Sequence, residues 1–131
     1  MEKEHWRRKE KNRKETVQRM KNIVVLINPE KKKELEQVFD TLDVGGVVIT
    51  NVQGFGNQKG IVTKFRGTEV KVNYLSKVQA ETVVPDYKVN ELVEELMDEL
   101  QTGNIGDGKI FIYNVEEAIR IRTGEKGEKA L

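Results

Sequence analysis

The chain of 131 residues contains no cysteine, only two prolines and a single histidine, and these scarcities exclude several classes of protein. Without cysteine, neither a disulfide framework nor a thiolate metal site can form. The histidine, His5, lies in a charged N-terminal stretch, so the remainder has no Ser-His or Cys-His pair that would activate a nucleophile. We therefore expect a protein that is not an enzyme.

Long hydrophobic runs are also missing. No run approaches the roughly 20 apolar residues that a membrane span needs, and the N-terminus lacks the apolar centre of a signal peptide. We expect a cytoplasmic protein, and a hydrophobic content of 37% over this length fits one small domain.

The first 19 residues differ from the rest in charge. Residues 1–19 carry eight Lys or Arg and four Glu, a net charge of +4, which leaves −3 for residues 20–131. This extension is expected to be a solvated helix or disordered, and an alternative is that Met20 is the native start. Because the electrostatic case for nucleic acid rests on the extension alone, we expect no nucleic-acid partner.

Residues 20–131 alternate between strand and helix patterns. Strand-like runs occupy residues 23–27, 47–50, 74–84 and 109–115, with a short fifth at 118–122. Asn28-Pro29 suits a helix start, whereas Gly45-Gly46 and Gly103 are expected to end the two helices. The helical stripes comprise Leu35, Val38, Phe39 and Leu42, then Val89, Leu92, Val93, Leu96, Met97 and Leu100.

The order βαββαβ predicts an α+β fold, a ferredoxin-like sandwich in which two helices cover one face of an antiparallel sheet. The other sheet face needs cover, which a homo-oligomer would supply. Residues from about 56 to 73 show no strong period and are expected to form a long exposed loop of functional importance. The stretches QGFG and IFIYNV resemble motifs of RNA-recognition modules, but they occur here in the reverse order, which disfavours that alternative.

The tetrapeptide GDGK is a candidate phosphate site. Gly106 and Gly108 would let backbone N–H groups approach an anion beside the charge of Lys109, although Asp-Gly is also an ordinary turn. Arg120 and Arg122 lie two apart on the predicted fifth strand and so would point the same way. An anion such as polyphosphate would relieve their repulsion, and pairing with surface carboxylates is the alternative.

Six motifs occur in order over residues 20–131: GFGNQKG, FRGTEV, LSKV, VVPD, TGNIGDGKIF and VEEAIRIRTGE. In sequence and spacing they resemble the PII signal-transduction proteins, the nitrogen regulatory P-II family. The resemblance implies a homotrimer of PII-like domains, with T-loops at about residues 56–73 and a nucleotide in each cleft between subunits. Residues 1–19 would lie outside this domain.

The resemblance also implies roles for individual residues. In such proteins ATP, Mg2+ and 2-oxoglutarate bind together, and Gln58 matches the glutamine that ligates the magnesium. Lys77 matches the lysine that pairs with the distal carboxylate of 2-oxoglutarate, and Lys59 and Gln58 would contact the same effector. The residues implied to bind ATP or ADP are Gly56, Gln58, Lys59, Gly60, Val83, Gly106, Asp107, Gly108, Lys109, Arg120 and Arg122.

The function that the resemblance implies is a switch. Gln58 and Lys59 lie at the root of the T-loop, so bound ligands are expected to change its shape and its affinity for a partner. That partner would be an ammonium channel or another target in nitrogen metabolism, with membrane contact only through the channel. Arg66 matches the arginine that inserts into the channel. The alternative is a specialised paralogue that regulates a nitrogenase or another metabolic enzyme.

Three positions depart from the family pattern. Val70 replaces the T-loop tyrosine that is uridylylated in many relatives, which excludes that modification there. Asn57 stands where an arginine commonly meets the terminal phosphate, and Val48 where a threonine hydroxyl meets adenine, so weakened ATP binding is expected. Two further alternatives are a weak ATP-hydrolysing enzyme, for which no general base is evident, and a structural trimer with a decayed site, which the matched lysines and arginines disfavour.

Overall fold

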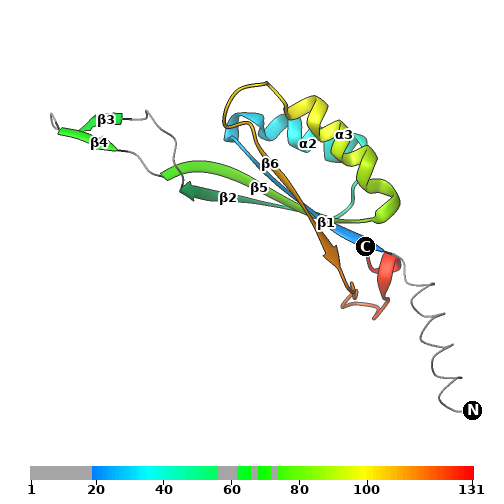
Figure 1. The fold of residues 1–131 in the computed structure, drawn as a ribbon. Coiled ribbons are helices and arrows are strands. Elements are labelled where there is room, and N and C mark those ends of the chain that lie inside the picture. Colours follow the sequence, from blue (N-terminus) through cyan, green and yellow to red (C-terminus); the bar gives the residue numbers. More distant parts are fainter. Residues whose placement is uncertain (1–18, 56–61, 66–67, 72–73) are drawn as a thin grey trace, which may run out of the picture.

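The computed structural model describes residues 19–55, 62–65, 68–71 and 74–131. Its main sheet has four antiparallel strands in the order β2-β5-β1-β6, and two helices lie on one face of it (Figure 1). This arrangement confirms the predicted ferredoxin-like α+β fold. The sheet and the helices on it comprise, in chain order, β1 (Met20–Ile27), η1 (Pro29–Lys31), α2 (Lys32–Thr41), β2 (Val47–Phe55), β5 (Tyr74–Pro85), η2 (Asp86–Lys88), α3 (Val89–Leu100) and β6 (Gly108–Val115).

The central strand β1 supplies much of the core. Its alternate residues Ile23, Val25 and Ile27 point toward the helices and are at most 2% exposed. Each buried side chain of this kind contributes roughly 1.5–3 kcal/mol, so the cluster fixes both helices on the sheet. The other members of the cluster are Leu35, Val38, Phe39, Val78, Ala80, Val84, Leu92, Leu96 and Leu100.

Both predicted helices are present, with differences in detail. α2 ends at Thr41, before the glycines that were expected to stop it, because Asp43 already turns the chain with a φ of 52°. Met97, predicted as part of the apolar stripe of α3, is 44% exposed, since the buried positions are the i, i+4 and i+8 series that includes Leu96. Among the helices in the described residues, none combines the length and the apolar character that crossing a membrane requires.

The sheet face opposite the helices bears large exposed side chains. Phe111 and Tyr113 of β6 are 42% and 54% exposed, and they stand across from Val24 and Asn22 of β1. Aromatic rings at this level of exposure on a sheet face are typical of an interaction surface. That further copies of the chain cover this sheet face stays a prediction.

The segment predicted as a featureless loop contains a hairpin. Strand β3 (Val62–Phe65) pairs antiparallel with β4 (Thr68–Lys71), with Val62 opposite Lys71 and Phe65 opposite Thr68. Both strands are rich in β-branched residues, a composition that favours strands and outweighs the weak periodicity. Figure 1 shows the hairpin beyond the ends of β2 and β5, away from the helices.

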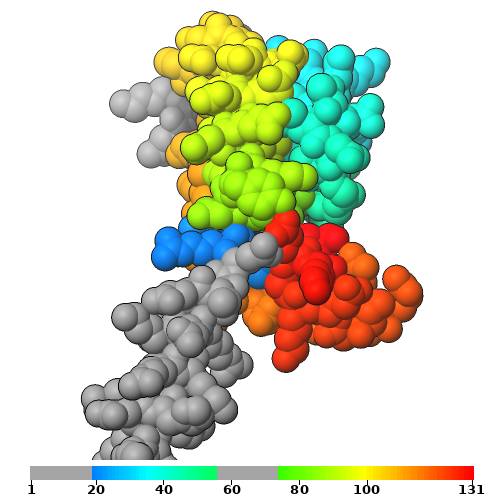
Figure 2. Space-filling view, turned by 90° about the vertical axis from the view of Figure 1, so that its right-hand side faces the viewer, coloured from blue at the N-terminus to red at the C-terminus, as the bar shows by residue number. Residues whose placement is uncertain are grey.

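The predicted fifth strand at residues 118–122 is wrong. The chain turns at 121–123, where the N–H of Gly124 donates to the carbonyl of Arg120 at 2.7 Å, and a single bridge joins Ile119 to Lys126. Gly124 permits this reversal with a φ of 71°, which a short apolar alternation does not overcome. The 3₁₀ turn η3 (Gly127–Ala130) follows, and the C-terminal segment packs beside the first residues of β1 (Figure 2).

Candidate functional site

The carboxylate of Asp107 holds the glycine-rich loop between α3 and β6 in shape. It accepts hydrogen bonds from the hydroxyl of Thr102, from the Thr102 backbone N–H at 2.8 Å and from the Gly103 N–H at 3.0 Å. These bonds, that of the hydroxyl foremost, keep the pKa of Asp107 below its ordinary value of 3.8. The ionised carboxylate thus points into its own loop and shapes it.

Two glycines of the loop have conformations that other residues rarely adopt. The φ angles of Gly106 and Gly108 are 94° and 120°. A Cβ added at Gly108 would lie 1.9 Å from the backbone oxygen of Leu26, so β1 itself requires glycine at this position. Lys109 follows with an exposed side chain. The loop therefore combines a cation with backbone that carries no side chain at two positions, at the end of the sheet where β1 ends.

Lys77 and Asn28 meet beside this loop. The Nζ of Lys77 donates to Oδ1 of Asn28 at 2.6 Å, and Nδ2 of Asn28 donates to the carbonyl of Gly106 at 2.8 Å. Lys77 is half-buried, and its stem passes Gly54, where an added Cβ would lie 3.5 Å from the lysine Cγ. The structure thus places the predicted effector lysine next to the predicted phosphate loop.

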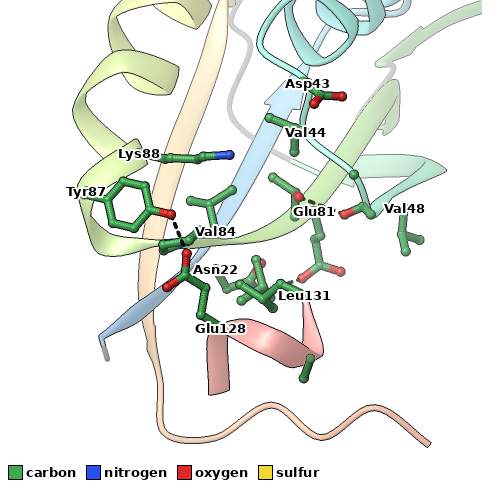
Figure 3. A pocket seen from close by; sticks show the side chains of 16 residues that line it. Asn22, Asp43, Val44, Val48, Glu81, Val84, Tyr87, Lys88, Glu128 and Leu131 are labelled. Atoms are coloured by element: carbon green, nitrogen blue, oxygen red, sulfur yellow. Dashed lines mark hydrogen bonds between the residues drawn. The ribbon is translucent and has the colours of Figure 1, made fainter. Parts of the chain in front are cut away.

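A pocket of about 650 Å³ lies toward the other end of β1. Val83, predicted to bind nucleotide, lines it together with Val48, which is 63% exposed. Two polar residues, Asn22 and Glu81, also line the pocket, and Nδ2 of Asn22 donates to Oε1 of Glu81 at 3.2 Å (Figure 3). Apolar walls with a few polar groups are typical of small-molecule sites.

The C-terminal turn forms one side of this pocket. Glu128, Ala130 and Leu131 line it, and the hydroxyl of Tyr87 donates a hydrogen bond to Glu128, as Figure 3 shows. This bond raises the pKa of Tyr87 above its ordinary value, because the bonded carboxylate favours the protonated phenol. The bond ties the turn to the start of α3.

The two predicted arginines do not project together from one strand. Nη2 of Arg120 donates to the carbonyl oxygen of Leu131 at 3.0 Å, and Nη1 lies 3.5 Å from Oε1 of Glu125. Arg122 is exposed in the turn at 121–123. Within one chain Arg120 thus pairs with a carboxylate, that of Glu125, which is the alternative that the sequence left open. Nucleotide binding by Arg120 or Arg122 stays a prediction.

The predicted nucleotide site is divided between the two ends of β1. Val83 stands opposite Asn22, whereas Gly108 stands opposite Ile27, five residues further along the strand. At the rise of an antiparallel strand the two positions are about 17 Å apart. One chain therefore does not bring the Val83 pocket and the Gly106–Lys109 loop together.

Several predicted site residues lie outside the described residues. They are Gly56, Gln58, Lys59 and Gly60, together with Asn57, and Arg66 of the predicted partner contact. Their roles stay predictions.

Asn28 and Pro29 begin a helical turn, as the sequence predicted, and Asn28 is at the N-cap position of η1. Its side chain does not cap the turn, because it bonds to Lys77 and Gly106 instead. Because Ile27 opposes Val78, extending the strand register by one residue would have placed Asn28 opposite Lys77. Strand register offers no such prediction for the hydrogen bonds that Asp107 accepts within its loop or for the bond between Tyr87 and Glu128.

The described geometry defines a ferredoxin-like domain with a candidate ligand region at each end of its central strand. A protein-family model described as Nitrogen regulatory protein P-II matches residues 20–125. The chain belongs to the nitrogen regulatory protein P-II family, as the resemblance of its motifs predicted.

Relatives in two bacteria agree with this assignment. A nitrogen regulatory protein P-II of Haemophilus influenzae is 47% identical over 112 residues, which cover 86% of this chain and 100% of the relative. Nitrogen regulatory protein P-II 1 of Escherichia coli is 43% identical over the same share of both chains. The match thus spans the whole length of these relatives.

Solved structures show the same fold. The B. subtilis GlnK-ATP complex matches with a TM-score of 0.71 at 30% identity, over 88% of this chain and 99% of that one. Arabidopsis thaliana PII bound to citrate matches with a TM-score of 0.69 at 30% identity, over 87% and 94%. One of these relatives was therefore solved with a nucleotide and the other with a carboxylate ligand.

Proposed function

We propose that this protein is a trimeric sensor of ATP, ADP and 2-oxoglutarate that controls nitrogen assimilation or ammonium transport through the shape of its T-loop. One observation carries the proposal: Lys77 lies beside the Gly106–Lys109 loop at the end of the sheet where β2 ends and β5 begins, on either side of residues 56–73. A dicarboxylate at Lys77 and phosphates at the loop would then both act on the root of that segment.

Trimer formation completes the divided nucleotide site. The Val83 pocket and the glycine-rich loop are offset by about 17 Å along β1 and lie on opposite sides of it, so we expect a nucleotide that needs both to lie between two copies. The exposed Phe111 and Tyr113 provide an apolar surface for such packing. In this arrangement one copy holds the base with Val48 and Val83, and its neighbour holds the phosphates.

The loop suits a polyphosphate. Gly106 and Gly108 carry no side chain that would keep an anion from the backbone, and Lys109 adds a positive charge. Lys59 would close over the same phosphates from the root of the T-loop, and Arg120 and Arg122 would reach them from the adjoining copy. Arg120 would have to exchange its contacts with Leu131 and Glu125 for the phosphate. The ATP complex of the B. subtilis relative supports a nucleotide ligand.

Lys77 suits the carboxylate of 2-oxoglutarate. An ammonium has three donors, and among the described residues Asn28 accepts from one of them, so a carboxylate could accept from another. Among the described residues no group of three His, Asp or Glu could hold a metal ion. On the resemblance of its motif, Gln58 would hold Mg2+ together with phosphate oxygens and the keto acid, an oxygen set that suits this ion. The citrate-bound A. thaliana relative supports binding of a carboxylate effector.

Titration calorimetry on the full chain tests this function. ATP with Mg2+ is titrated in the absence and in the presence of 2-oxoglutarate, and ADP is titrated under the same two conditions. We expect 2-oxoglutarate to raise the affinity for ATP by about fivefold or more and to leave that for ADP nearly unchanged. Equal ATP affinity with and without 2-oxoglutarate, and no heat from the keto acid itself, would refute the sensor.

A further inference from the structure

The side chain of Asn28 joins two segments that are far apart in the sequence. Its amide oxygen accepts from Lys77 on β5, and its amide nitrogen donates to Gly106 in the loop before β6. We infer that Asn28 is a positioning residue that couples the effector lysine to the phosphate loop. This inference rests on the proposed function, because it assumes that Lys77 and the loop each receive a ligand.

The chemistry of the two partners calls for an amide. The Lys77 ammonium can only donate, and the Gly106 carbonyl can only accept, so the group between them must accept on one side and donate on the other. A carboxylate would set an oxygen against the Gly106 carbonyl, and an aliphatic side chain would leave both partners without this link. The Asn28–Gly106 contact of 2.8 Å lies within the usual range of N–H···O hydrogen bonds, and the Lys77–Asn28 contact of 2.6 Å is slightly shorter than that range.

The surroundings of Asn28 make this connection stiff. Its backbone is fixed between the last residue of β1 and Pro29, and its carbonyl accepts from the N–H of Lys31 at 3.1 Å. The stem of Lys77 passes Gly54, where an added Cβ would lie 3.5 Å from the lysine Cγ, so the absence of a side chain there leaves space for the stem. A displacement of the Lys77 ammonium is therefore transmitted to the amide, and from the amide to the Gly106 carbonyl.

The Gly106 carbonyl belongs to the same peptide group as the N–H of Asp107. The peptide is trans, so this N–H points away from the Gly106 carbonyl, and turning the carbonyl turns the N–H of the loop with it. A carboxylate drawn to Lys77 would pull on one end of the connection, and phosphates in the loop would pull on the other. Asn28 thus gives the two ligands a direct means of affecting each other's affinity, in addition to any shared magnesium ion.

A chemical-shift experiment without ligands tests the connection itself. Amide spectra are recorded for the full chain and for Lys77→Ala, Asn28→Ala and the double variant. With Asn28 present, Lys77→Ala is expected to move the Asp107 amide resonance. In the Asn28→Ala background the same lysine substitution should leave that resonance in place. A shift of equal size in both backgrounds, or in neither, would overturn the inference.

A calorimetric experiment tests the coupling. In the wild type, 2-oxoglutarate is expected to raise the ATP affinity by a certain factor. In Asn28→Ala this factor should be smaller by about fivefold or more, while the ADP affinity changes far less. Asn90→Ala, which removes an exposed asparagine at the start of α3, is the matched control and should keep the wild-type factor. An unchanged factor in Asn28→Ala would overturn the inference.

The two ideas fail in different ways. If the wild-type chain does not bind 2-oxoglutarate, the proposed function fails, and the chemical-shift experiment alone decides whether Asn28 joins Lys77 to the loop. If the wild type couples ATP to 2-oxoglutarate and Asn28→Ala does so equally, the function stands and the inference fails. Thermal unfolding of each variant shows whether a changed affinity reflects only a loss of folding.

Discussion

Substituting Gly108 by alanine probes the point where the glycine-rich loop enters the sheet. The new Cβ would lie 1.9 Å from the backbone oxygen of Leu26 and 3.2 Å from Cα of Ile27, both in the central strand. These are backbone atoms of β1, so they cannot move aside as the end of a flexible side chain would. The loop must therefore shift, or the pairing of β1 with β6 must open at this end.

The expected cost has two parts. A residue other than glycine at a φ of 120° costs about 1–3 kcal/mol, and forcing atoms into an occupied space costs typically 1–3 kcal/mol more. Gly103→Ala is the matched control in the same loop: its φ is 85°, and an added Cβ meets no described atom within 4 Å. The control is therefore expected to lose only about 1–2 kcal/mol for its backbone conformation.

Urea unfolding at a single protein concentration measures both variants, since the stability of an assembly depends on concentration. Because the backbone costs of the two variants are similar, we expect Gly108→Ala to lose about 1–3 kcal/mol more than Gly103→Ala, the cost of the occupied space, and to bind ADP more weakly. If the two variants unfold at the same urea concentration, contact with Leu26 is not the reason that position 108 requires glycine.

Three further predictions concern the ligands and the loop. Lys77→Ala is expected to abolish 2-oxoglutarate binding while ADP binding persists in calorimetry; equal loss of both would mean that Lys77 serves the nucleotide. The pKa of Asp107 is lower in the folded protein than its ordinary value of 3.8. The hydrogen bonds that its carboxylate accepts in the loop should therefore be fully formed above pH 3.8 and be lost as the pH falls through the pKa of the folded protein. The Thr102 and Gly103 amide resonances should show this titration, and Asp107→Asn should remove it. Arg66→Glu is expected to abolish association with membranes that contain the ammonium channel, and undiminished association in sedimentation would contradict the channel as partner.

Some of the architecture was predictable from local patterns. The apolar run at 23–27 and the two helical stripes predicted β1, α2 and α3, because each pattern continues for the length of its element. The AIRIR stretch failed as a strand because Gly124, just beyond it, reverses the chain after one bridge. A short alternation does not show whether a neighbouring strand is within reach, and that depends on the whole fold.

The candidate site was predictable in its members more than in its geometry. The motifs identified Lys77 and the Gly106–Lys109 loop, and the fold places them side by side. The link through Asn28 was missed because a residue before proline resembles a helix cap in the sequence. The separation of Val83 from Gly108 follows from strand register, which no single motif encodes.

The division of the site between the two ends of β1 has a genetic consequence. A variant damaged at the Val83 pocket and a variant damaged at the Gly106–Lys109 loop would each be inactive in an assembly of identical chains. When the two are produced together, an undamaged pocket of one variant can face an undamaged loop of the other. Such mixed assemblies would recover part of the nucleotide binding, whereas two variants damaged at the same end would not.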